Sequence, residues 1–405
     1  MTAPTFVFVA TGMGAHLSGG DVTSIELARR LLQSGHRVIL VTSVAGKRSC
    51  EAAGLKAEFW VFDTSEAEPR TLLGAAFHLV KRMIKAANFL RLTHMQEPTI
   101  VFPSSDMLND VLAATFVRGT NIRWLALLHM VIPSPLKGYL GAFSSGRRRY
   151  GIDVRCGLNW IQQRASLTVM RRWYSMVIPQ SPHNRRFLEK KLPRALIAPF
   201  NCPPGVANSN ESAMITSRQK VYDACWLGRF HVQKGIPDLL GAWDIVRQER
   251  PTAKLALIGN VDRELSALIE RLGVEESVIC LGYLSGQEKF DALRSSRLFL
   301  FPSYYESWGF AIAEAMACGL PVVAYDLPVY RGIYPKGMLT APVGNTQELA
   351  KCVLQLLQDD RLYTQLAEEA RQAVSIYDWD RSVMSFVEAT ALAFAAPRDS
   401  RMGSR

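Results

Sequence analysis

The chain lacks a framework of paired cysteines. Its seven cysteines are scattered over 405 residues, and no two of them form a C-x-x-C pair. This spacing excludes a disulfide-stapled scaffold and a cysteine-based metal framework, and it is typical of a reducing compartment. Two of the seven, Cys280 and Cys318, fall in segments that we expect to be buried. The pattern predicts a cytoplasmic protein.

Long hydrophobic runs are also missing, although 48% of the residues are hydrophobic. No stretch approaches the roughly 20 apolar residues that a membrane-spanning helix needs. The first apolar run, at residues 5–10, follows no basic leader and continues into a glycine-containing loop, so it predicts a strand rather than a signal peptide. A chain of this length and composition has enough apolar residues for two domains, each with its own core.

Acidic residues are scarce in the first half of the chain. Residues 1–200 carry 26 Lys and Arg against 12 Asp and Glu, a net charge of +14, whereas the remainder carries 21 against 24, a net charge of −3. The scarcity is greatest at 137–194, where aromatic residues lie among the cations. Such a segment suits an anionic membrane surface, a solvated basic face or nucleic acid. We expect no nucleic-acid partner because no motif for one is present, and the first two interpretations stay open.

Short apolar strands alternate with helical segments along the chain, which predicts α/β domains with parallel sheets. In the first half we expect strands at residues 5–10, 37–41, 58–62, 99–102 and 124–129. A polar stretch at 201–220 is expected to link two domains. The predicted boundaries are 1–200 for the first domain and 221–378 for the second, followed by a last helix at about 379–396.

Two features of the first half suggest a ligand at the carboxyl ends of its strands. Gly19 and Gly20 open a predicted helix after the first strand, where bare backbone N–H groups could face a phosphate. His129 ends the predicted strand 124–129, a position at the edge of a site rather than within a core. A tight turn and a structural histidine are the alternatives at this point.

Two cations follow the first strand of the second half. The strand at 221–227 leads into the segment GRFHVQKG, in which Arg229 and Lys234 precede a helix. An arginine and a lysine at a helix start could bind a diphosphate, the first through two hydrogen bonds and the second as a point charge. Two ordinary surface cations are the alternative.

The stretch from 298 to 326 reads as strand, loop, helix and strand. Glu306 lies in the loop and Glu314 in the helix, with seven residues between them. The backbone N–H groups of Trp308, Gly309 and Phe310 at the helix start favour an anion. Carboxylates would repel phosphates, so we expect both glutamates to bond the hydroxyl groups of a sugar. A buried helix with one capping glutamate is the alternative.

The segment PSYYESWGFAIAEAMACGLPVVA resembles the signature of glycosyltransferase family 4, which comprises retaining, nucleotide-sugar-dependent enzymes of the GT-B fold. Glu306 and Glu314 are similar to the paired glutamates of that family. Arg229 and Lys234 match its Gly-Arg…Lys-Gly motif. The resemblance covers most of the chain and implies two facing Rossmann-like domains, with the site in the cleft between them and the last helix crossing back onto the first domain.

The resemblance also implies roles for single residues. Glu314 would bind the ribose, Glu306 the sugar hydroxyls, and His129 the donor sugar. The diphosphate ligands would be Arg229, Lys234 and the N–H groups of Gly309 and Phe310, with Trp308 beside them. Further donor contacts would come from Gly19, Gly20, Tyr283 and Leu284, the last two lying along the base. The family often has a glycine where Val261 stands, so the approach to the nucleotide differs there.

These implications together predict an enzyme that moves a sugar from a nucleoside-diphosphate sugar to a glycan or lipid-linked acceptor, with retention of configuration and without a metal or other cofactor. The expected setting is cell-surface polysaccharide or glycolipid synthesis, in the cytoplasm or at the inner face of the plasma membrane. A nucleotide-sugar epimerase of the same fold and a non-catalytic nucleotide-sugar-binding subunit are the alternatives.

Overall fold

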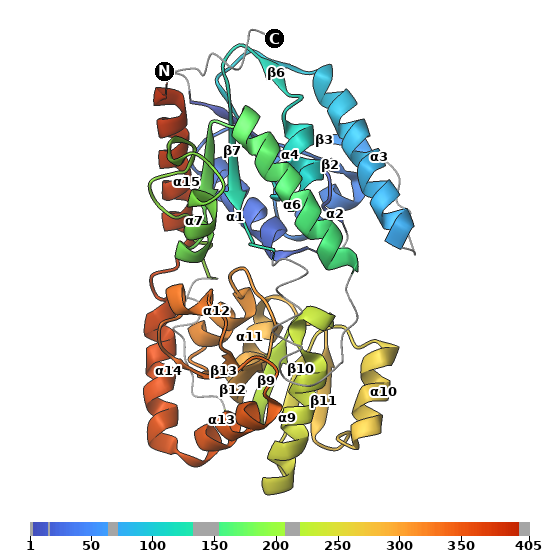
Figure 1. The fold of residues 1–405 in the computed structure, drawn as a ribbon, viewed down its shortest axis with the longest axis vertical. Helices are drawn as coiled ribbons and strands as arrows, with labels where there is room; N and C mark the ends of the chain where they lie inside the picture. The colour runs from blue at the N-terminus through green and yellow to red at the C-terminus, as the bar shows by residue number, and fades with distance from the viewer. Residues whose placement is uncertain (1–2, 15–16, 64–71, 133–153, 207–218, 397–405) are drawn as a thin grey trace. The chain divides into compact units, whose positions relative to one another are not determined.

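The computed structural model describes residues 3–14, 17–63, 72–132, 154–206 and 219–396 (Figure 1). The chain divides into two compact units. Unit 1 comprises Met1–Pro135, Ile152–Gly205 and Trp379–Arg405, and unit 2 comprises Leu136–Gly151 and Val206–Asp378. The basic residues at 137–153 and most of the predicted linker, at 207–218, lie outside the described residues.

Unit 1 is built on a six-stranded parallel sheet of order β3-β2-β1-β5-β7-β8. The strands are β1 (Thr5–Ala10), β2 (Val38–Ser43), β3 (Glu58–Asp63), β5 (Thr99–Pro103), β7 (Ile122–Leu128) and β8 (Met176–Pro179). Every residue of β1 and β2 is buried. This explains their largely apolar sequences, because both faces of the sheet are covered by helices. A two-stranded pair, β4 (His94–Met95) and β6 (Arg118–Gly119), lies apart from this sheet.

Helices cover both faces of this sheet. On one face Phe6, Phe8 and Phe102 of the strands pack against Phe386 of the last helix. That layer holds α1 (Gly19–Gln33), α2 (Val44–Ala52) and α15 (Trp379–Ala395). The opposite layer holds α3 (Leu72–Arg91), α4 (Leu108–Ala114), α6 (Val154–Trp173) and α7 (Pro182–Glu189). In Figure 1, α3, α4 and α6 lie next to one another, with α4 in contact with both neighbours.

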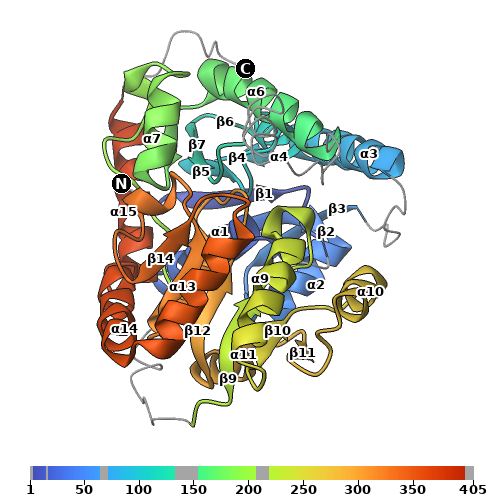
Figure 2. The same cartoon turned by 60° about the horizontal axis from the view of Figure 1, so that its bottom comes forward.

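Unit 2 repeats the design with a parallel sheet of order β11-β10-β9-β12-β13-β14. Its strands are β9 (Tyr222–Leu227), β10 (Leu255–Ile258), β11 (Val278–Gly282), β12 (Ser296–Phe301), β13 (Val322–Tyr325) and β14 (Met338–Ala341). Its helices are α9 (Ile236–Glu249), α10 (Arg263–Leu272), α11 (Gly286–Arg294), α12 (Phe310–Ala317), α13 (Thr346–Gln358) and α14 (Asp360–Val374). Figure 2 shows that α9 and α13 lie side by side on the same face of the sheet.

The predicted strands and helices are confirmed to within a few residues, and one prediction of burial is wrong. Cys280 is exposed, because β11 is the edge strand of its sheet and has one neighbouring strand, β10. Cys318 is half-buried at the C-cap of α12. In the described part of the chain, no helix combines the length and apolar character required to cross a bilayer.

Candidate active site

In both sheets the strand order reverses beside the first strand of the unit. In unit 2 the chain passes from β9 to β10 and β11 on one side, then returns to β12 on the other side of β9. Unit 1 does the same around β1, with β5 on the far side. Ligands of such sheets bind beyond the carboxyl ends of the strands at this reversal. The candidate loops are therefore 228–235 and 302–309 in unit 2, and 11–14 and 104–107 in unit 1.

The two candidate loops of unit 2 are joined by backbone and side-chain hydrogen bonds. The amide of Tyr304 donates to the carbonyl of Gln233 at 2.9 Å, and Nε2 of Gln233 donates to the carbonyl of Tyr305 at 2.6 Å. Gly235 has a φ of 64°, and a Cβ atom there would lie 2.1 Å from the carbonyl oxygen of Pro302. Only glycine fits this contact, so its presence lets the two loops pack together.

The structure brings Lys234 and Glu306 together at this junction. Nζ of Lys234 lies 2.6 Å from Oε1 of Glu306, whose side chain is only 6% exposed. The same ammonium lies 5.0 Å from the ring centroid of Phe301. Each charge therefore has a partner, which a carboxylate so deeply buried requires.

Glu314 has a partner that the sequence analysis missed. Nζ of Lys289 lies 2.6 Å from Oε1 of Glu314, and both side chains are 19% exposed. Lys289 belongs to α11 and Glu314 to α12, so only the tertiary fold brings the two together. No spacing in the sequence signals this pair. The one general indication is that a largely buried carboxylate such as that of Glu314 requires a cation as its partner.

Residues 308–310 form the start of α12. Gly309 is the N-cap residue, with a φ of 80°, and as a glycine it has no side chain of its own to cap the helix. The first N–H groups of a helix have no partners within it and attract anions. Trp308 is buried, and its ring centroid lies 4.7 Å from that of Tyr377. Trp308 therefore anchors the loop through packing.

The other residues predicted to bind the donor in unit 2 lie nearer the surface. Arg229 is exposed in the loop after β9, and its side chain makes no ion pair with any residue that the structure describes. Tyr283 is 72% exposed and Leu284 is half-buried, just beyond the end of β11. The structure thus places Arg229 in the same loop as Lys234, and the two base-contacting candidates two strands away from β9.

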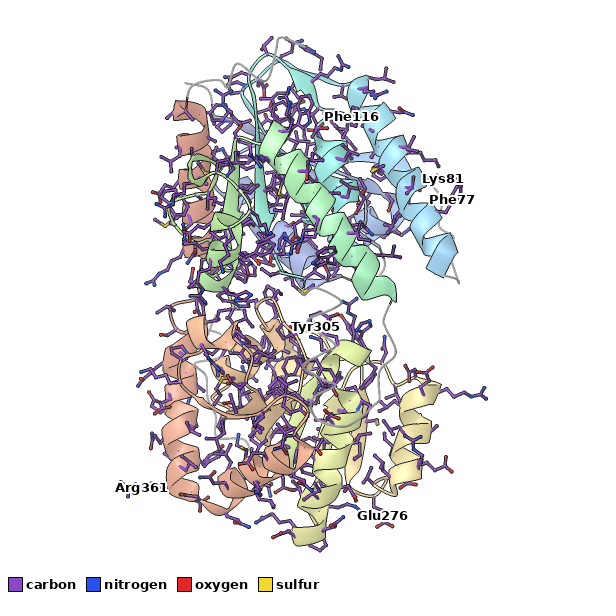
Figure 3. The ribbon with its side chains drawn as sticks, in the orientation of Figure 1. Phe77, Lys81, Phe116, Glu276, Tyr305 and Arg361 are labelled. Atoms are coloured by element: carbon purple, nitrogen blue, oxygen red, sulfur yellow. The ribbon has the colours of Figure 1, made fainter. Side chains whose placement is uncertain are left out.

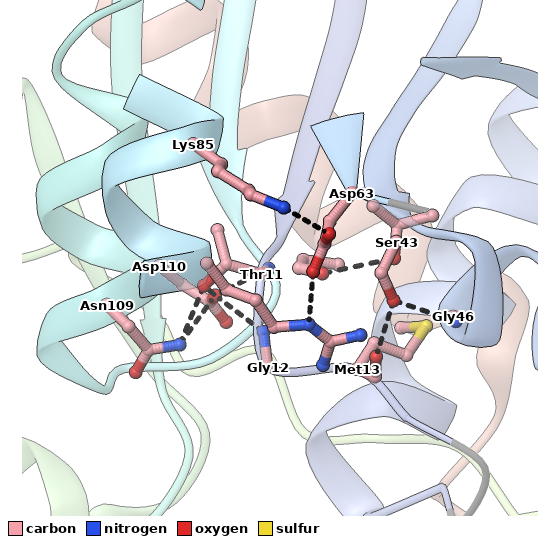
Figure 4. Close-up of polar contacts among 12 residues, drawn as sticks. Thr11, Gly12, Met13, Ser43, Gly46, Asp63, Lys85, Asn109 and Asp110 are labelled. Atoms are coloured by element: carbon pink, nitrogen blue, oxygen red, sulfur yellow. Dashed lines mark hydrogen bonds and ion pairs between the residues drawn. The ribbon is translucent and has the colours of Figure 1, made fainter. Parts of the chain in front are cut away.

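Unit 1 carries a buried carboxylate at its own strand reversal (Figure 4). Oδ1 of Asp110 accepts hydrogen bonds from the amide and hydroxyl groups of Thr11, at 2.7 and 2.5 Å, and from Nδ2 of Asn109 at 3.0 Å. Its Oδ2 accepts from the hydroxyl of Ser105 at 2.6 Å. Burial raises the pKa of Asp110 to about 6. No local sequence pattern marks Asp110 as a site residue, yet it holds the loop after β1 against the loop after β5.

A second buried carboxylate, Asp106, lies in the loop after β5. Nε2 of Gln163, from α6, donates to its Oδ2 at 2.8 Å. Oε1 of Gln163 accepts from the amide of Ile132 at 3.0 Å. Burial raises the pKa of Asp106 to about 7. Gln163 therefore ties α6, the loop after β7 and the loop after β5 to one another.

His129 and Gly20 lie next to each other in unit 1. His129 follows the last residue of β7 and is 9% exposed, and a Cβ atom on Gly20 would lie 3.6 Å from its Nδ1. Burial lowers the pKa of His129 to about 4, so the imidazole is neutral at pH 7. Its Nε2 is buried without a hydrogen-bond partner among the described residues. A neutral imidazole with an unpartnered nitrogen can bond a polar group of a ligand.

Gly19 and Gly20 are the first two residues of α1. Ser18 before them and Asp21 after them form a capping box. The hydroxyl of Ser18 accepts from the amide of Asp21, and the carboxylate of Asp21 accepts from the amide of Ser18 at 2.7 Å. This pattern, S-x-x-D, stands in the sequence and was overlooked. A phosphate approaching the two glycines would share the helix start with the carboxylate of Asp21.

Among the residues that the structure describes, no three His, Cys, Asp or Glu side chains are grouped in a way that could hold a metal ion. The carboxylates of both candidate sites are instead paired with lysines or hydrogen-bonded, as described above. The chemistry available to them is the recognition of hydroxyl groups and phosphates by charged and polar side chains.

Residues 209–373 match the family model described as "Glycosyl transferases group 1". Among solved structures, an Anabaena protein named HepE, in complex with UDP and glucose, superposes with a TM-score of 0.68 at 18% identity, over 96% of this chain and 100% of the other. A mutant of Staphylococcus aureus TarM gives 0.72 at 13% identity, over 97% of this chain and 100% of the other. The chain has the GT-B fold. The predicted α/β fold with two Rossmann-like domains is thereby confirmed.

Similarity to curated proteins is confined to part of the chain. Phosphatidyl-myo-inositol mannosyltransferase of Mycobacterium leprae is 32% identical over 158 residues, 38% of this chain and 42% of that protein. Mannosylfructose-phosphate synthase of Agrobacterium fabrum is 32% identical over 166 residues, 38% of this chain and 37% of that protein. The chain spans about two fifths of the length of the curated relatives that it matches.

Proposed function

We propose that the protein is a retaining glycosyltransferase of family 4 that takes its sugar from a nucleoside-diphosphate donor. The observation that carries the proposal is the junction of the loops after β9 and β12. There Lys234, Glu306 and the start of α12, whose N-cap residue is Gly309, lie at the strand reversal of the unit that matches the group 1 model. A cation that could bind a diphosphate and a carboxylate that could bind sugar hydroxyls thus lie at the same edge of one sheet.

The proposed chemistry uses charge stabilisation of the leaving group. As the bond between the anomeric carbon and the diphosphate oxygen breaks, negative charge develops on the diphosphate. Arg229, Lys234 and the first amide groups of α12 stabilise that charge. An oxygen of the leaving phosphate accepts the proton of the acceptor hydroxyl, so this mechanism requires no side-chain base. Because the cations do this work, we propose that no metal takes part.

The two glutamates have different proposed partners. Glu306 bonds the hydroxyl groups of the donor sugar. Lys234, its ion-pair partner, turns toward the diphosphate when the donor binds. Glu314, which is paired with Lys289, bonds the ribose hydroxyls. In unit 1 the unpartnered Nε2 of His129 bonds the donor sugar.

We also propose a glycan or lipid-linked acceptor and a place in cell-surface polysaccharide or glycolipid synthesis, in the cytoplasm or bound peripherally at the inner face of the plasma membrane. Two relatives support this through their names, phosphatidyl-myo-inositol mannosyltransferase and O-antigen chain mannosyltransferase B. The net charge of +14 on residues 1–200 supports an anionic surface as partner.

A panel of nucleoside-diphosphate sugars, incubated with the protein, a lipid extract and a chelator, tests the proposal. We expect sugar transfer, or slow donor hydrolysis, with one donor, and an α-anomeric donor should give an α-linked product. A changed sugar without release of nucleotide would instead identify an epimerase. Binding without turnover of any donor would identify a non-catalytic nucleotide-sugar-binding protein.

A further inference from the structure

Helix α3 of unit 1 exposes a row of large apolar side chains. Phe77 is 72% exposed, Val80 50% and Ile84 51%. Positions three and four residues apart lie on the same face of a helix, so the three side chains form one stripe. The helix does not need this stripe for folding, because its inner face is separately buried through Ala86 and Leu90, both 0% exposed. α3 is thus apolar on two faces, and only one of them faces the core of unit 1.

All four charged residues of α3 are cations. Arg82 is buried and lies 3.5 Å from the carboxylate of Asp63 at the end of β3. Lys85, whose side chain is partly exposed, lies 2.8 Å from the same carboxylate (Figure 4). Asp63 anchors the helix to the sheet, and its negative charge offsets that of Arg82 and Lys85 but not that of the other two cations. Arg91, near the helix end, is exposed and lies 4.4 Å from the ring centroid of Phe116. The helix therefore keeps positive charge at its solvent side.

The remaining cation lies within the apolar stripe. Lys81 is exposed, and Figure 3 shows it beside Phe77 on the outer side of α3, directed away from the sheet. We call the outer surface formed by Phe77, Val80, Lys81 and Ile84 the α3 face. An apolar stripe with lysine in it matches the pattern of helices that lie in the interface of an anionic bilayer.

We propose that the α3 face docks unit 1 on the surface of an anionic lipid bilayer. Apolar side chains enter the region between headgroups and acyl chains, while Lys81 and Arg91 attract the anionic headgroups. A second copy of the chain is a poorer occupant, because two such faces would bring cations against cations. The inference rests on the proposed membrane association and assigns it to described residues rather than to the basic residues at 137–153.

Sedimentation with vesicles tests the α3 face. The protein is mixed with vesicles of phosphatidylglycerol and phosphatidylcholine, or of phosphatidylcholine alone. We expect binding to the anionic vesicles and weak binding to the neutral ones. The double variant Phe77→Ser with Ile84→Ser should lose affinity for the anionic vesicles by about tenfold or more, because two large apolar side chains no longer leave water. Lys81→Glu should lose a similar factor through charge reversal.

A matched control comes from α15, on the opposite layer of unit 1. Met384 is 69% exposed and Val387 37%, and they stand three residues apart on that helix. The double variant Met384→Ser with Val387→Ser should bind vesicles like the wild type. Far-ultraviolet circular dichroism and thermal unfolding check that all variants fold, and hydrolysis of the donor in solution checks that the transferase site is intact.

Three outcomes would overturn the proposal. The α3 double variant could bind as tightly as the wild type, the α15 control could lose as much affinity as the α3 variant, or the wild type could ignore anionic vesicles. A dimer in size-exclusion chromatography that the α3 variant alone dissociates would assign the face to a second copy. Loss of vesicle binding with donor hydrolysis retained would leave the transferase function standing, whereas absence of any donor turnover would contradict that function and not the docking.

Discussion

At the scale of the single residue, the two cations after β9 differ in what their removal does to the fold. Arg229 is exposed, so Arg229→Ala removes charge at the diphosphate and little else. Lys234→Ala also leaves the carboxylate of Glu306, 6% exposed, without its partner. We expect each variant to lose more than about 10²-fold in turnover, since both lose stabilisation of the leaving diphosphate. Only Lys234→Ala should also unfold at a lower denaturant concentration.

Steady-state rates with the donor identified in the panel provide the measurement, and Arg331→Ala provides the control. Arg331 is an exposed cation of unit 2 that pairs with Asp326. Near wild-type turnover of both Arg229→Ala and Lys234→Ala, with the control unchanged, would remove the diphosphate clamp from the mechanism.

The two glutamates should separate nucleotide binding from sugar use. Glu314→Ala should lower the affinity for free nucleoside diphosphate by about 1–3 kcal/mol, the range for hydrogen bonds to a charged group, because the ribose contact is made before and during the reaction. Glu306→Ala should leave that affinity unchanged and impair turnover of the intact donor. Calorimetric titration of the nucleotide into both variants measures the difference. Equal affinities of Glu314→Ala and the wild type would exclude the ribose role.

The buried carboxylates of unit 1 give a pH dependence of stability with a defined sign. Burial raises the pKa of Asp106 from 3.8 to about 7, so the folded state holds this proton where the unfolded state releases it. Its contribution to stability is complete below the unfolded pKa and is lost as the pH rises through about 7. Asp110, with its pKa raised to about 6, acts in the same direction. His129 opposes them, because its pKa is lowered to about 4.

Asp106→Asn isolates one of these groups, since the amide is close in shape and does not ionise. The free energy of unfolding of the variant, measured in urea, should improve relative to the wild type as the pH is raised from about 5 to about 8. A difference between variant and wild type that stays constant over this range would show that Asp106 does not titrate there.

At the scale of elements, strand positions were predictable because strands buried on both faces read as unbroken apolar runs. β1 was placed residue for residue, and β12 was placed to within two residues. The burial of Cys280 was mispredicted because the sequence of β11 carries no sign that it is an edge strand. Partners such as Lys289 for Glu314, or Asp110 for the loop after β1, arise only when distant segments meet, so no local pattern could reveal them.

The loop that carries Glu306 depends on helix α9 for its position. Oδ2 of Asp238, in the first turn of α9, accepts from the hydroxyls of Tyr304 and Tyr325 at 2.7 and 2.6 Å. Tyr304→Phe should lower the free energy of unfolding by roughly 1–3 kcal/mol and raise KM for the donor, because the loop loses a hydrogen bond to a carboxylate. Denaturant unfolding and steady-state kinetics measure the two effects.

Tyr363→Phe is the matched control for that change. Tyr363 lies on α14, and its hydroxyl makes no hydrogen bond with any residue that the structure describes. If Tyr304→Phe and Tyr363→Phe behaved alike in both measurements, the link from α9 to the Glu306 loop would have no role in positioning.

At the scale of the whole molecule, the charge is divided between the halves of the chain. Residues 1–200 carry +14 and the remainder −3, while Arg229, Lys234 and Glu314, which we propose to bind the nucleotide, lie in unit 2. Attraction to a bilayer and recognition of the nucleotide should therefore respond to different changes. Salt distinguishes the two contributions to bilayer binding, because it screens charge and leaves apolar contacts in place.

We expect the protein to sediment with anionic vesicles at low ionic strength and to be largely released at 1 M salt, where the Debye length falls to about 3 Å. Arg147, Arg148 and Arg149, which lie outside the described residues, test the predicted contribution of the basic segment. Changing all three to Ser should weaken vesicle binding, since each cation near an anionic surface contributes about 1 kcal/mol, and should leave nucleotide affinity unchanged. Vesicle binding that ignores both salt and this triple change would contradict an electrostatic attachment through the first half of the chain. In that case the apolar stripe of α3 would have to account for the binding alone.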